Sequence, residues 1–344
     1  MDILSFAYTD LRKKPAEKIR DYLALSGNHR LTIGVYVKGM FYVFGNPKEE
    51  RQYRYDIGSI SKTITAHLIL KLCGEGKLDM THTVDKILPL KEGKYPSIYQ
   101  LLTHTAGYHH LTPVGITVPS LLAHGYARKN LYENCTIKTV ITCLERRRFF
   151  RQKSRYGYSD FASAILATVA QEVTQTPFAV LFEEFIQKEL GLSNTAIEVC
   201  DKERQPLAAK GKRILPFWKW ERENPYIAGG GVVSNIEDVL RYLALQVESE
   251  KPYITAAHVV CRQSQLKNNN HLMCMGWHTY RKSDQLWHVG GVGTFRSSVI
   301  VNRKRKIGVA VLGNAKGKAA ANVHYIAKMI YSELKNKRVG SIAT

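Results

Sequence analysis

The tetrapeptide Ser59-Ile60-Ser61-Lys62 has a spacing that suits nucleophilic catalysis. Gly58 precedes it and a helical pattern begins at once, so Ser59 is expected at a helix N-terminus, beside unpaired backbone N–H groups. Lys62 then lies one turn further on the same face, where its amine can take the hydroxyl proton and let Ser59 attack a carbonyl carbon. On its own, the tetrapeptide is explained more simply by a capping serine and a surface lysine.

Four further segments place polar groups or glycines beside predicted elements. Tyr158-Ser159-Asp160 precedes a helix expected from Phe161, and Trp287-His288-Val289-Gly290-Gly291 precedes an apolar strand. Leu101–Gly107 reads Leu-Leu-Thr-His-Thr-Ala-Gly, and Ala228–Ser234 reads Ala-Gly-Gly-Gly-Val-Val-Ser. This context favours the chemical interpretation of the tetrapeptide.

In their order, these five segments resemble the motifs of the serine β-lactamase and D-Ala-D-Ala peptidase family, particularly its class C-like branch. In that family S-x-x-K opens a helix, Y-x-N lies in the helical domain, and K-T-G or H-x-G lies on a sheet strand. The L-L-T-H-T-S-G signature recurs with Ala106 in place of Ser. The resemblance extends from about Leu31 to Asn314.

The resemblance implies a covalent acyl-transfer site. Ser59 would be the nucleophile, Lys62 its base or proton relay, and Tyr158 the second acid/base that passes a proton to the leaving group. A core aromatic is the alternative interpretation of Tyr158. Tyr156 is its rival for the role, although the Y-S-D spacing favours Tyr158.

The resemblance also implies groups that bind the substrate. The backbone N–H groups of Ser59 and Gly291 would form the oxyanion hole, with Gly290 beside them on the same strand. His288 would line the site and orient the substrate, although a satisfied buried histidine is the alternative. His104 is expected to be structural and to fix the turn after Leu101-Leu102.

Asp160 departs from the family pattern, which has Asn at this position. An Asn amide both accepts and donates hydrogen bonds, whereas an ionised Asp only accepts. Asp160 is therefore expected to keep Lys62 protonated, which opposes its role as a base. The substitution also removes the donor that would hold a peptide or β-lactam carbonyl.

His288 is the second departure, because it replaces the Lys of K-T-G. Histidine occurs there in several peptidase and esterase branches of the family, so catalysis is expected to survive. A neutral His offers less positive charge to a substrate carboxylate, a loss that Arg296 could offset. Both departures argue against an efficient β-lactamase.

Three functions remain open from the sequence. The first is a serine hydrolase of small esters, D-amino-acid amides or peptides, and weakly of β-lactams. The second is a non-catalytic sensor or binding module that retains the pocket. The third and weakest is a binder of anionic polymers. No cofactor and no metal are predicted, because no ligand pair at a metal spacing accompanies His109 and His110.

The charge balance is the one unusual feature of the composition. Lys and Arg number 50 against 29 Asp and Glu, a net charge of +21. Such a surplus can attract nucleic acid or another anionic polymer, but no RNA-binding motif or zinc-finger spacing is present, so specific nucleic-acid binding is not expected. The sequence does not assign an oligomeric state. The denser basic clusters are Arg146–Arg155, Lys210–Arg213 and Arg303–Lys306.

The remaining composition is that of a globular protein. Of the 344 residues, 44% are hydrophobic and 23% charged, which excludes disordered and collagen-like chains. Without a secretion pattern or a run of about 18 apolar residues, a cytoplasmic protein with no membrane span is expected. The 6 scattered Cys, without a C-x-x-C pair, predict buried reduced thiols.

Strand and helix patterns then suggest how these residues are positioned. Leu31–Val37 and Met40–Phe44 predict one hairpin, and Ser297–Val301 and Ile307–Leu312 predict another around the Arg303–Lys306 turn. His110–Lys138 is only weakly periodic and predicts loops or short helices. Helices are predicted over Ile60–Leu72, Phe161–Val173, Phe178–Ile186, Val239–Leu243 and Ala319–Leu334, with caps at Thr176-Pro177 and at a Ser234/Glu237 capping box.

This order predicts an α/β (α+β) fold of the β-lactamase/transpeptidase type. A central antiparallel sheet, built from both termini and flanked by helices, would receive an inserted, mostly helical domain. The sheet domain would comprise residues 1–75 and 225–344 and the helical domain residues 76–224. The active site would lie in the cleft between them.

Overall fold

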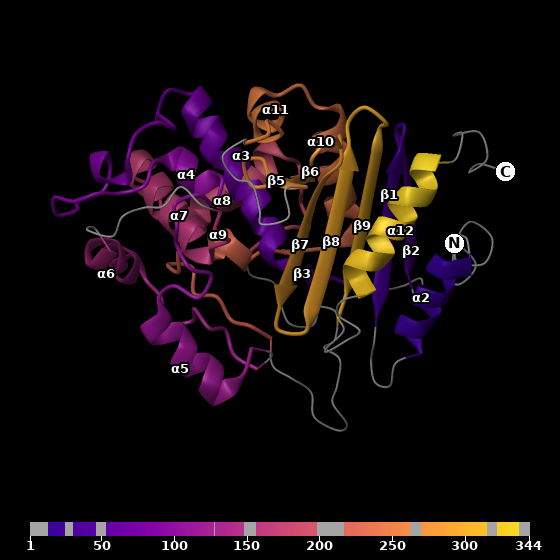
Figure 1. The fold of residues 1–344 in the computed structure, drawn as a ribbon, viewed down its shortest axis with the longest axis horizontal. Coiled ribbons are helices and arrows are strands. Elements are labelled where there is room, and N and C mark those ends of the chain that lie inside the picture. The colour runs from indigo at the N-terminus through magenta and orange to yellow at the C-terminus, as the bar shows by residue number, and fades with distance from the viewer. Residues whose placement is uncertain are drawn as a thin grey trace.

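The computed structural model describes residues 13–24, 30–45, 53–126, 128–147, 156–197, 217–261, 270–314 and 322–336 (Figure 1). The main feature of the described structure is a 7-stranded antiparallel sheet in the order β2-β1-β9-β8-β7-β6-β5. Strands β1 and β9, from opposite ends of the sequence, pair with each other. The predicted assembly of the sheet from both ends of the chain is therefore confirmed. The strands are β1 (Leu31–Val37), β2 (Met40–Gly45), β5 (His271–Met273), β6 (His278–Tyr280), β7 (Leu286–Val292), β8 (Phe295–Asn302) and β9 (Ile307–Gly313). A separate small sheet pairs β3 (Tyr55–Asp56) with β4 (Val233–Ser234).

Both predicted hairpins are present. Lys38 and Gly39, between β1 and β2, have φ values of 46° and 90°, the left-handed backbone that a tight two-residue turn requires. The basic Arg303–Lys306 segment connects β8 to β9 as a hairpin turn. The Lys210–Arg213 cluster lies outside the described residues.

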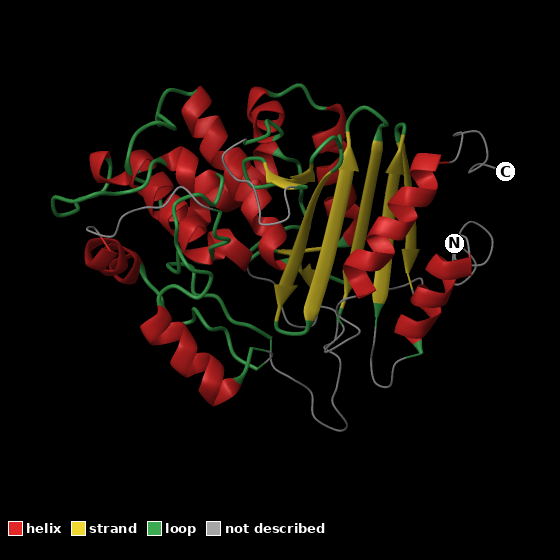
Figure 2. Cartoon of the chain, in the orientation of Figure 1, coloured by secondary structure: helices red, strands yellow, loops and turns green. Residues whose placement is uncertain are grey.

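Helices cover both faces of the sheet (Figure 2). Helices α2 (Lys13–Leu23) and α12 (Asn322–Asn336) pack on one face, where Val323, Ile326 and Ile330 of α12 are buried against the strands. This confirms the predicted C-terminal helix from Asn322 onward, whereas the predicted start at Ala319 lies outside the described residues. Helix α10 (Ile236–Glu248) packs on the opposite face against β1, β8 and β9.

Two glycines let α10 approach the sheet closely. A Cβ atom on Gly34 of β1 would lie 2.7 Å from the Leu240 Cγ atom, and one on Gly308 of β9 would lie 3.0 Å from the Leu243 Cβ atom. Any larger residue at Gly34 would therefore force the Leu240 side chain, or the helix that carries it, to move.

The helical part of the chain is arranged around α3 (Ser61–Gly74), which continues from a 3₁₀ turn, η2 (Gly58–Ile60). Nearly every α3 residue from Ser61 to Leu72 is buried, so the helix is central rather than amphipathic. It packs against α7 and α9. The other elements are η3 (Val84–Lys86), α4 (Ile98–Leu102), α5 (Val114–His124), α6 (Ile137–Arg147), α7 (Asp160–Thr174), α8 (Phe178–Glu184), a π-helical turn (Phe185–Glu189), α9 (Ile227–Gly230) and α11 (Pro252–Ala257).

Two predicted helix caps are wrong. The α10 N-cap is Asn235, whose side chain accepts a hydrogen bond from the Asp238 N–H at 2.9 Å, rather than Ser234. Ser234 belongs to β4, and its hydroxyl shares a hydrogen bond with Thr195. At α8, Pro177 is the N-cap rather than the first helical residue, so the predicted Thr176 cap is displaced by one position.

The weakly periodic 110–138 stretch contains an 11-residue helix, α5, and the first residues of α6. Among the described cysteines, Cys135, Cys261 and Cys274 are buried, Cys73 and Cys143 are half-buried, and all of them are free thiols. None of the helices in the described ranges has both the length and the hydropathy needed to cross a membrane. The domain division at residues 75 and 225 stays a prediction.

The corrected α10 cap is testable by mutation. We expect Asn235→Ala to lower the free energy of unfolding by about 1 kcal/mol, because the Asp238 N–H loses its side-chain acceptor. Glu237→Ala removes the exposed carboxylate of the discarded capping box and should cost less than about 0.5 kcal/mol. Urea denaturation of both variants measures the two losses of unfolding free energy. A larger loss in Glu237→Ala than in Asn235→Ala would favour the Ser234/Glu237 capping box instead.

Candidate active site

Ser59 lies in the η2 turn, two residues before the first residue of α3, so it stands at the N-terminal end of that helix as its sequence context predicts. Gly58 adopts φ +54°, and a Cβ atom there would lie 2.5 Å from the Gly291 backbone nitrogen. Only glycine allows the turn to approach β7 this closely. The Ser61 hydroxyl donates to the Gly58 carbonyl at 2.7 Å and fixes the same turn.

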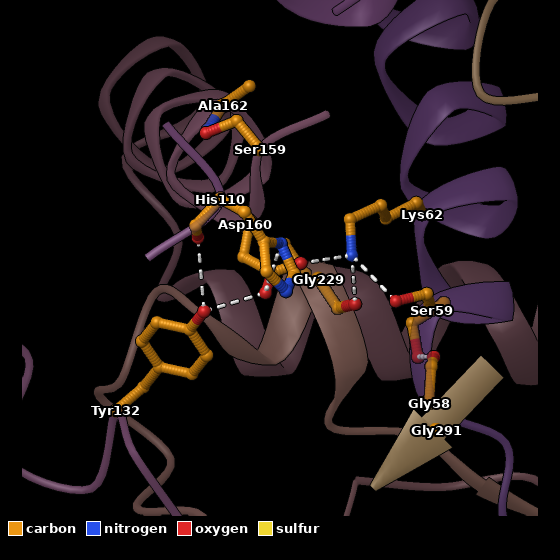
Figure 3. Close-up of polar contacts among 12 residues, drawn as sticks. Gly58, Ser59, Lys62, His110, Tyr132, Ser159, Asp160, Ala162, Gly229 and Gly291 are labelled. Atoms are coloured by element: carbon orange, nitrogen blue, oxygen red, sulfur yellow. Dashed lines mark hydrogen bonds and ion pairs between the residues drawn. The ribbon is translucent and has the colours of Figure 1, made fainter. Parts of the chain in front are cut away.

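Lys62 is the centre of the polar network (Figure 3). Its Nζ atom donates to Ser59 Oγ at 3.0 Å and to the Gly229 carbonyl at 2.6 Å, and it lies 2.5 Å from Asp160 Oδ1. The three partners match the three N–H donors of an ammonium group. The side chain is only 2% exposed, so these partners replace water around the charge.

Asp160 is the first residue of α7, where Ser159 serves as the N-cap. Its second oxygen, Oδ2, accepts a hydrogen bond from the Tyr132 hydroxyl at 2.7 Å and lies 3.6 Å from His110 Nδ1. Tyr132 is held in turn by stacking on Tyr226, with ring centroids 4.3 Å apart. The carboxylate is therefore fixed from the helical side and directed at Lys62.

The electrostatics of this pair favour the charged form of both groups. Burial alone would lower the pKa of Lys62, but the Asp160 carboxylate and, to a smaller extent, Tyr158 together offset burial, and the pKa is raised above its usual value. Burial would raise the pKa of Asp160, yet the nearby Lys62 charge leaves it lowered. Lys62 is thus an ammonium at neutral pH, the state expected from an Asp at position 160.

Tyr158 lies beside this pair. The Lys62 Nζ atom is 4.9 Å from the centre of the Tyr158 ring. Burial raises the pKa of the Tyr158 phenol, while the Lys62 charge and hydrogen bonding with Lys62 and Ser59 oppose that rise. The Tyr156 ring instead packs edge-on against His104, at 6.4 Å. The geometry therefore favours Tyr158 over Tyr156 as the phenol nearest to Ser59 and Lys62.

His104 holds the turn that follows α4. It adopts φ +54°, its carbonyl accepts a hydrogen bond from the Gly157 N–H at 2.8 Å, and its ring lies 4.8 Å from that of Tyr158. These contacts suit the structural role expected for this residue.

His288 lies on β7 and is 1% exposed. Burial and the Lys62 charge lower the pKa of His288 to about 3, so the ring is neutral. Its Nδ1 atom lies 2.8 Å from the Val289 carbonyl and must carry the proton of that hydrogen bond. Arg296, on β8, donates through Nη1 to the Gly293 and Phe295 carbonyls, at 3.1 and 2.6 Å.

Gly290 and Gly291 bring β7 against the serine turn. A Cβ atom on Gly290 would lie 1.9 Å from the Ile57 carbonyl oxygen, so only glycine fits there. The Gly291 carbonyl accepts a hydrogen bond from the Tyr126 hydroxyl at 2.6 Å. Since the N–H and C=O groups of one strand residue point to the same side, the Gly291 N–H also points away from β8, towards the turn that holds Ser59.

A cavity of about 600 Å³ joins these groups. Its walls include Ser59, Tyr158 and His288 together with Gly290 and Gly291. The structure therefore brings every predicted site residue to one cavity or, for Lys62 and Asp160, to the network directly behind it. Within the described ranges, no group of three or more His, Cys, Asp or Glu side chains is arranged to hold a metal ion.

Three contributors to the site were not singled out from the sequence. The Gly229 carbonyl lies in the glycine-rich segment Ala228–Ser234, one of the five motif segments, so a signal for it existed. Tyr126 and Tyr132 have no such signal, because the stretch around them is weakly periodic.

The family comparison agrees with the motif order. A family model described as Beta-lactamase matches residues 31–329. A beta-lactamase from Providencia stuartii is 31% identical over 207 residues, which cover 57% of this chain and 48% of that protein. The chain spans about half the length of the curated relatives it matches.

Solved structures share the fold. The octameric penicillin-binding protein homologue from Pyrococcus abyssi has a TM-score of 0.76 and 21% identity, covering 93% of this chain and 76% of that one. A class C beta-lactamase has a TM-score of 0.75 and 15% identity, covering 94% and 98%. The β-lactamase/transpeptidase-like fold and the class C resemblance expected from the sequence are confirmed.

The buried imidazoles predict that stability falls in mild acid. Burial is the main cause of the lowered pKa of His104, His278 and His288. Below about pH 6.5 these histidines bind protons in the unfolded chain but stay neutral in the folded chain. The free energy of unfolding therefore decreases as the pH falls from 6.5.

We expect the variant His288→Gln to lose less stability than the wild type between pH 7.5 and pH 5. A single histidine with a folded pKa of about 3 contributes about 2 kcal/mol to the loss at pH 5. Urea denaturation at both pH values measures it. Equal losses in the two proteins would contradict a buried neutral His288.

Proposed function

Because the chain belongs to the beta-lactamase family of serine hydrolases, we propose that it hydrolyses its substrate through an acyl-enzyme on Ser59. The substrate would be a small ester, a D-amino-acid amide or peptide or, weakly, a β-lactam. The observation that carries this proposal is the 3.0 Å contact between Lys62 Nζ and Ser59 Oγ, at the wall of a cavity. A surface lysine beside a capping serine would not be buried in this way.

In the proposed acylation step, a neutral Lys62 takes the Ser59 hydroxyl proton as Oγ bonds to the substrate carbonyl carbon. The Ser59 and Gly291 N–H groups stabilise the negative charge on the carbonyl oxygen. Tyr158 then donates its proton to the leaving alcohol or amine as the bond to the carbonyl carbon breaks, and the Lys62 proton restores the phenol. Water next attacks the acyl carbonyl carbon and gives one proton to the neutral Lys62. As the bond from that carbon to Ser59 Oγ breaks, Lys62 returns the proton to Oγ, and the acid leaves.

The Lys62–Asp160 ion pair makes this reaction slow at neutral pH. The step requires neutral Lys62, whereas the neighbouring carboxylate favours the ammonium. The same observation favours the second candidate, a binding module that is acylated but does not turn over. A burst of product without steady-state turnover would identify that module.

His288 and Arg296 bear on how the substrate is held. The neutral His288 supplies no fixed charge for a carboxylate. Arg296 lines the cavity, but its Nη1 atom is already held by two backbone carbonyls. The site is therefore proposed to favour substrates without a carboxylate beside the scissile bond.

Covalent labelling tests the nucleophile. We expect incubation with a fluorophosphonate to add one label, mapped by tandem mass spectrometry to Ser59 rather than to the buried Ser61. Ser59→Ala should abolish labelling and lower turnover of p-nitrophenyl esters by at least about 10³-fold. Absence of an adduct in the folded wild-type protein would reject the covalent role.

The pH dependence of acylation tests the ion pair. Asp160→Asn removes the charge that raises the pKa of Lys62, so the pH range over which the labelling rate increases should move to lower pH. We expect labelling at pH 7 to be faster on the order of tenfold. The matched control, Tyr132→Phe, removes one hydrogen bond to Asp160 but retains the carboxylate. The pH dependence of its labelling rate should therefore stay close to that of the wild type. If the pH dependence of labelling is the same in Asp160→Asn as in the wild type, the Lys62–Asp160 ion pair is not what slows acylation at neutral pH.

A further inference from the structure

Among the strands that the structure describes, none pairs with the edge of β7 that lies beside Ser59 and opposite β8 beyond Trp287. Strand β8 pairs with β7 from Leu286 to Val292, whereas β6 pairs only with Leu286 and Trp287. The Gly291 carbonyl bonds to Tyr126 and so points to this open side. Backbone groups repeat every two residues along a strand, so those of Val289 point to the same side.

Both outward carbonyls of this edge already have donors from the chain itself. The Tyr126 hydroxyl donates to the Gly291 carbonyl at 2.6 Å, and His288 Nδ1 donates to the Val289 carbonyl at 2.8 Å. The edge therefore offers backbone N–H donors to a ligand, whereas each of its two carbonyls already accepts one hydrogen bond from the chain itself.

The side chain of Tyr126 is held in place by contacts with neighbouring residues. The Trp218 indole donates to the Tyr126 carbonyl at 3.1 Å, and the two rings meet edge-on at 4.9 Å. The Arg296 guanidinium lies 5.8 Å from the centre of the Tyr126 ring. Burial raises the pKa of Tyr126 to about 12, although Arg296 opposes the rise, so the phenol keeps the proton that it donates.

The hydrogen bond from Tyr126 to the Gly291 carbonyl affects which substrates can bind along this edge. An extended peptide-like group binds an open strand edge by donating its own N–H to an outward carbonyl. An acylamino group beside the scissile carbonyl would have to compete with the Tyr126 hydroxyl for the Gly291 carbonyl. An acyl group without that N–H requires only the N–H donors of the edge.

We propose that Tyr126 is a specificity-determining residue that disfavours N-acylamino substrates and directs the site to simple acyl esters. This inference rests on the proposed acyl-enzyme chemistry at Ser59 and specifies its substrate class. Tyr126 acts here through its hydrogen bond to the strand.

Two isosteric esters test the proposal. The p-nitrophenyl ester of N-acetylglycine carries an N–H where p-nitrophenyl 4-oxopentanoate carries a CH₂ group. The ratio of their kcat/KM values is compared between wild type and variants, which cancels the different intrinsic reactivities of the two esters. We expect Tyr126→Phe, which keeps the ring and removes only the hydroxyl, to raise the ratio of the N-acetylglycine ester to the oxopentanoate ester about tenfold.

Tyr156→Phe is the matched control, because it removes a phenol hydroxyl from the same cavity wall, where the Tyr156 ring packs against His104. Its ratio should equal that of the wild type. An unchanged or lower ratio in Tyr126→Phe, with fluorophosphonate labelling of Ser59 intact, overturns the role of Tyr126 alone. Failure of Ser59 to be labelled in the wild type overturns the acyl-enzyme proposal and this inference together.

Discussion

The buried ammonium group of Lys62 is the constraint on which the site depends. A charge removed from water is tolerated only when its donors find partners, and breaking a buried pair leaves an uncompensated charge that costs several kcal/mol. The partners of Lys62 come from three separate elements: Ser59 on η2, Asp160 on α7 and the Gly229 carbonyl on α9. Satisfying one cation therefore aligns three parts of the chain that are far apart in sequence.

Close backbone packing completes the alignment from the sheet side. Gly58 and Gly290 remove the side chains that would separate the serine turn from β7, and the Ser297 hydroxyl donates to the Ile57 carbonyl at 2.7 Å across the same junction. The turn is thus held by Lys62 from the helices and by glycine contacts from the strands. The oxyanion donors gain a fixed position because the turn is packed and hydrogen-bonded on both sides.

Local features were the ones that the sequence predicted well. The spacing of Ser59 and Lys62 is decided by a single helical turn, and the β1–β2 hairpin by the turn residues between its strands. Where two adjacent residues could both cap a helix, as Ser234 and Asn235 could, the outcome depended on β4 pairing with β3, which is a tertiary effect. The role of Tyr126 was not predictable, because its contact with β7 joins residues 165 positions apart, across a segment without periodicity.

The pairing of β1 with β9 has a consequence for biosynthesis. Residue 31 pairs with residue 313, so the N-terminal hairpin leaves the ribosome long before its neighbour exists. At about 5–20 residues per second, the apolar edge of β1 waits on the order of tens of seconds for that partner. The intervening helices contain many local contacts and form early, whereas closure of the sheet is a late, long-range event. A nascent chain of this protein is therefore most prone to aggregation in the interval before its last strand emerges.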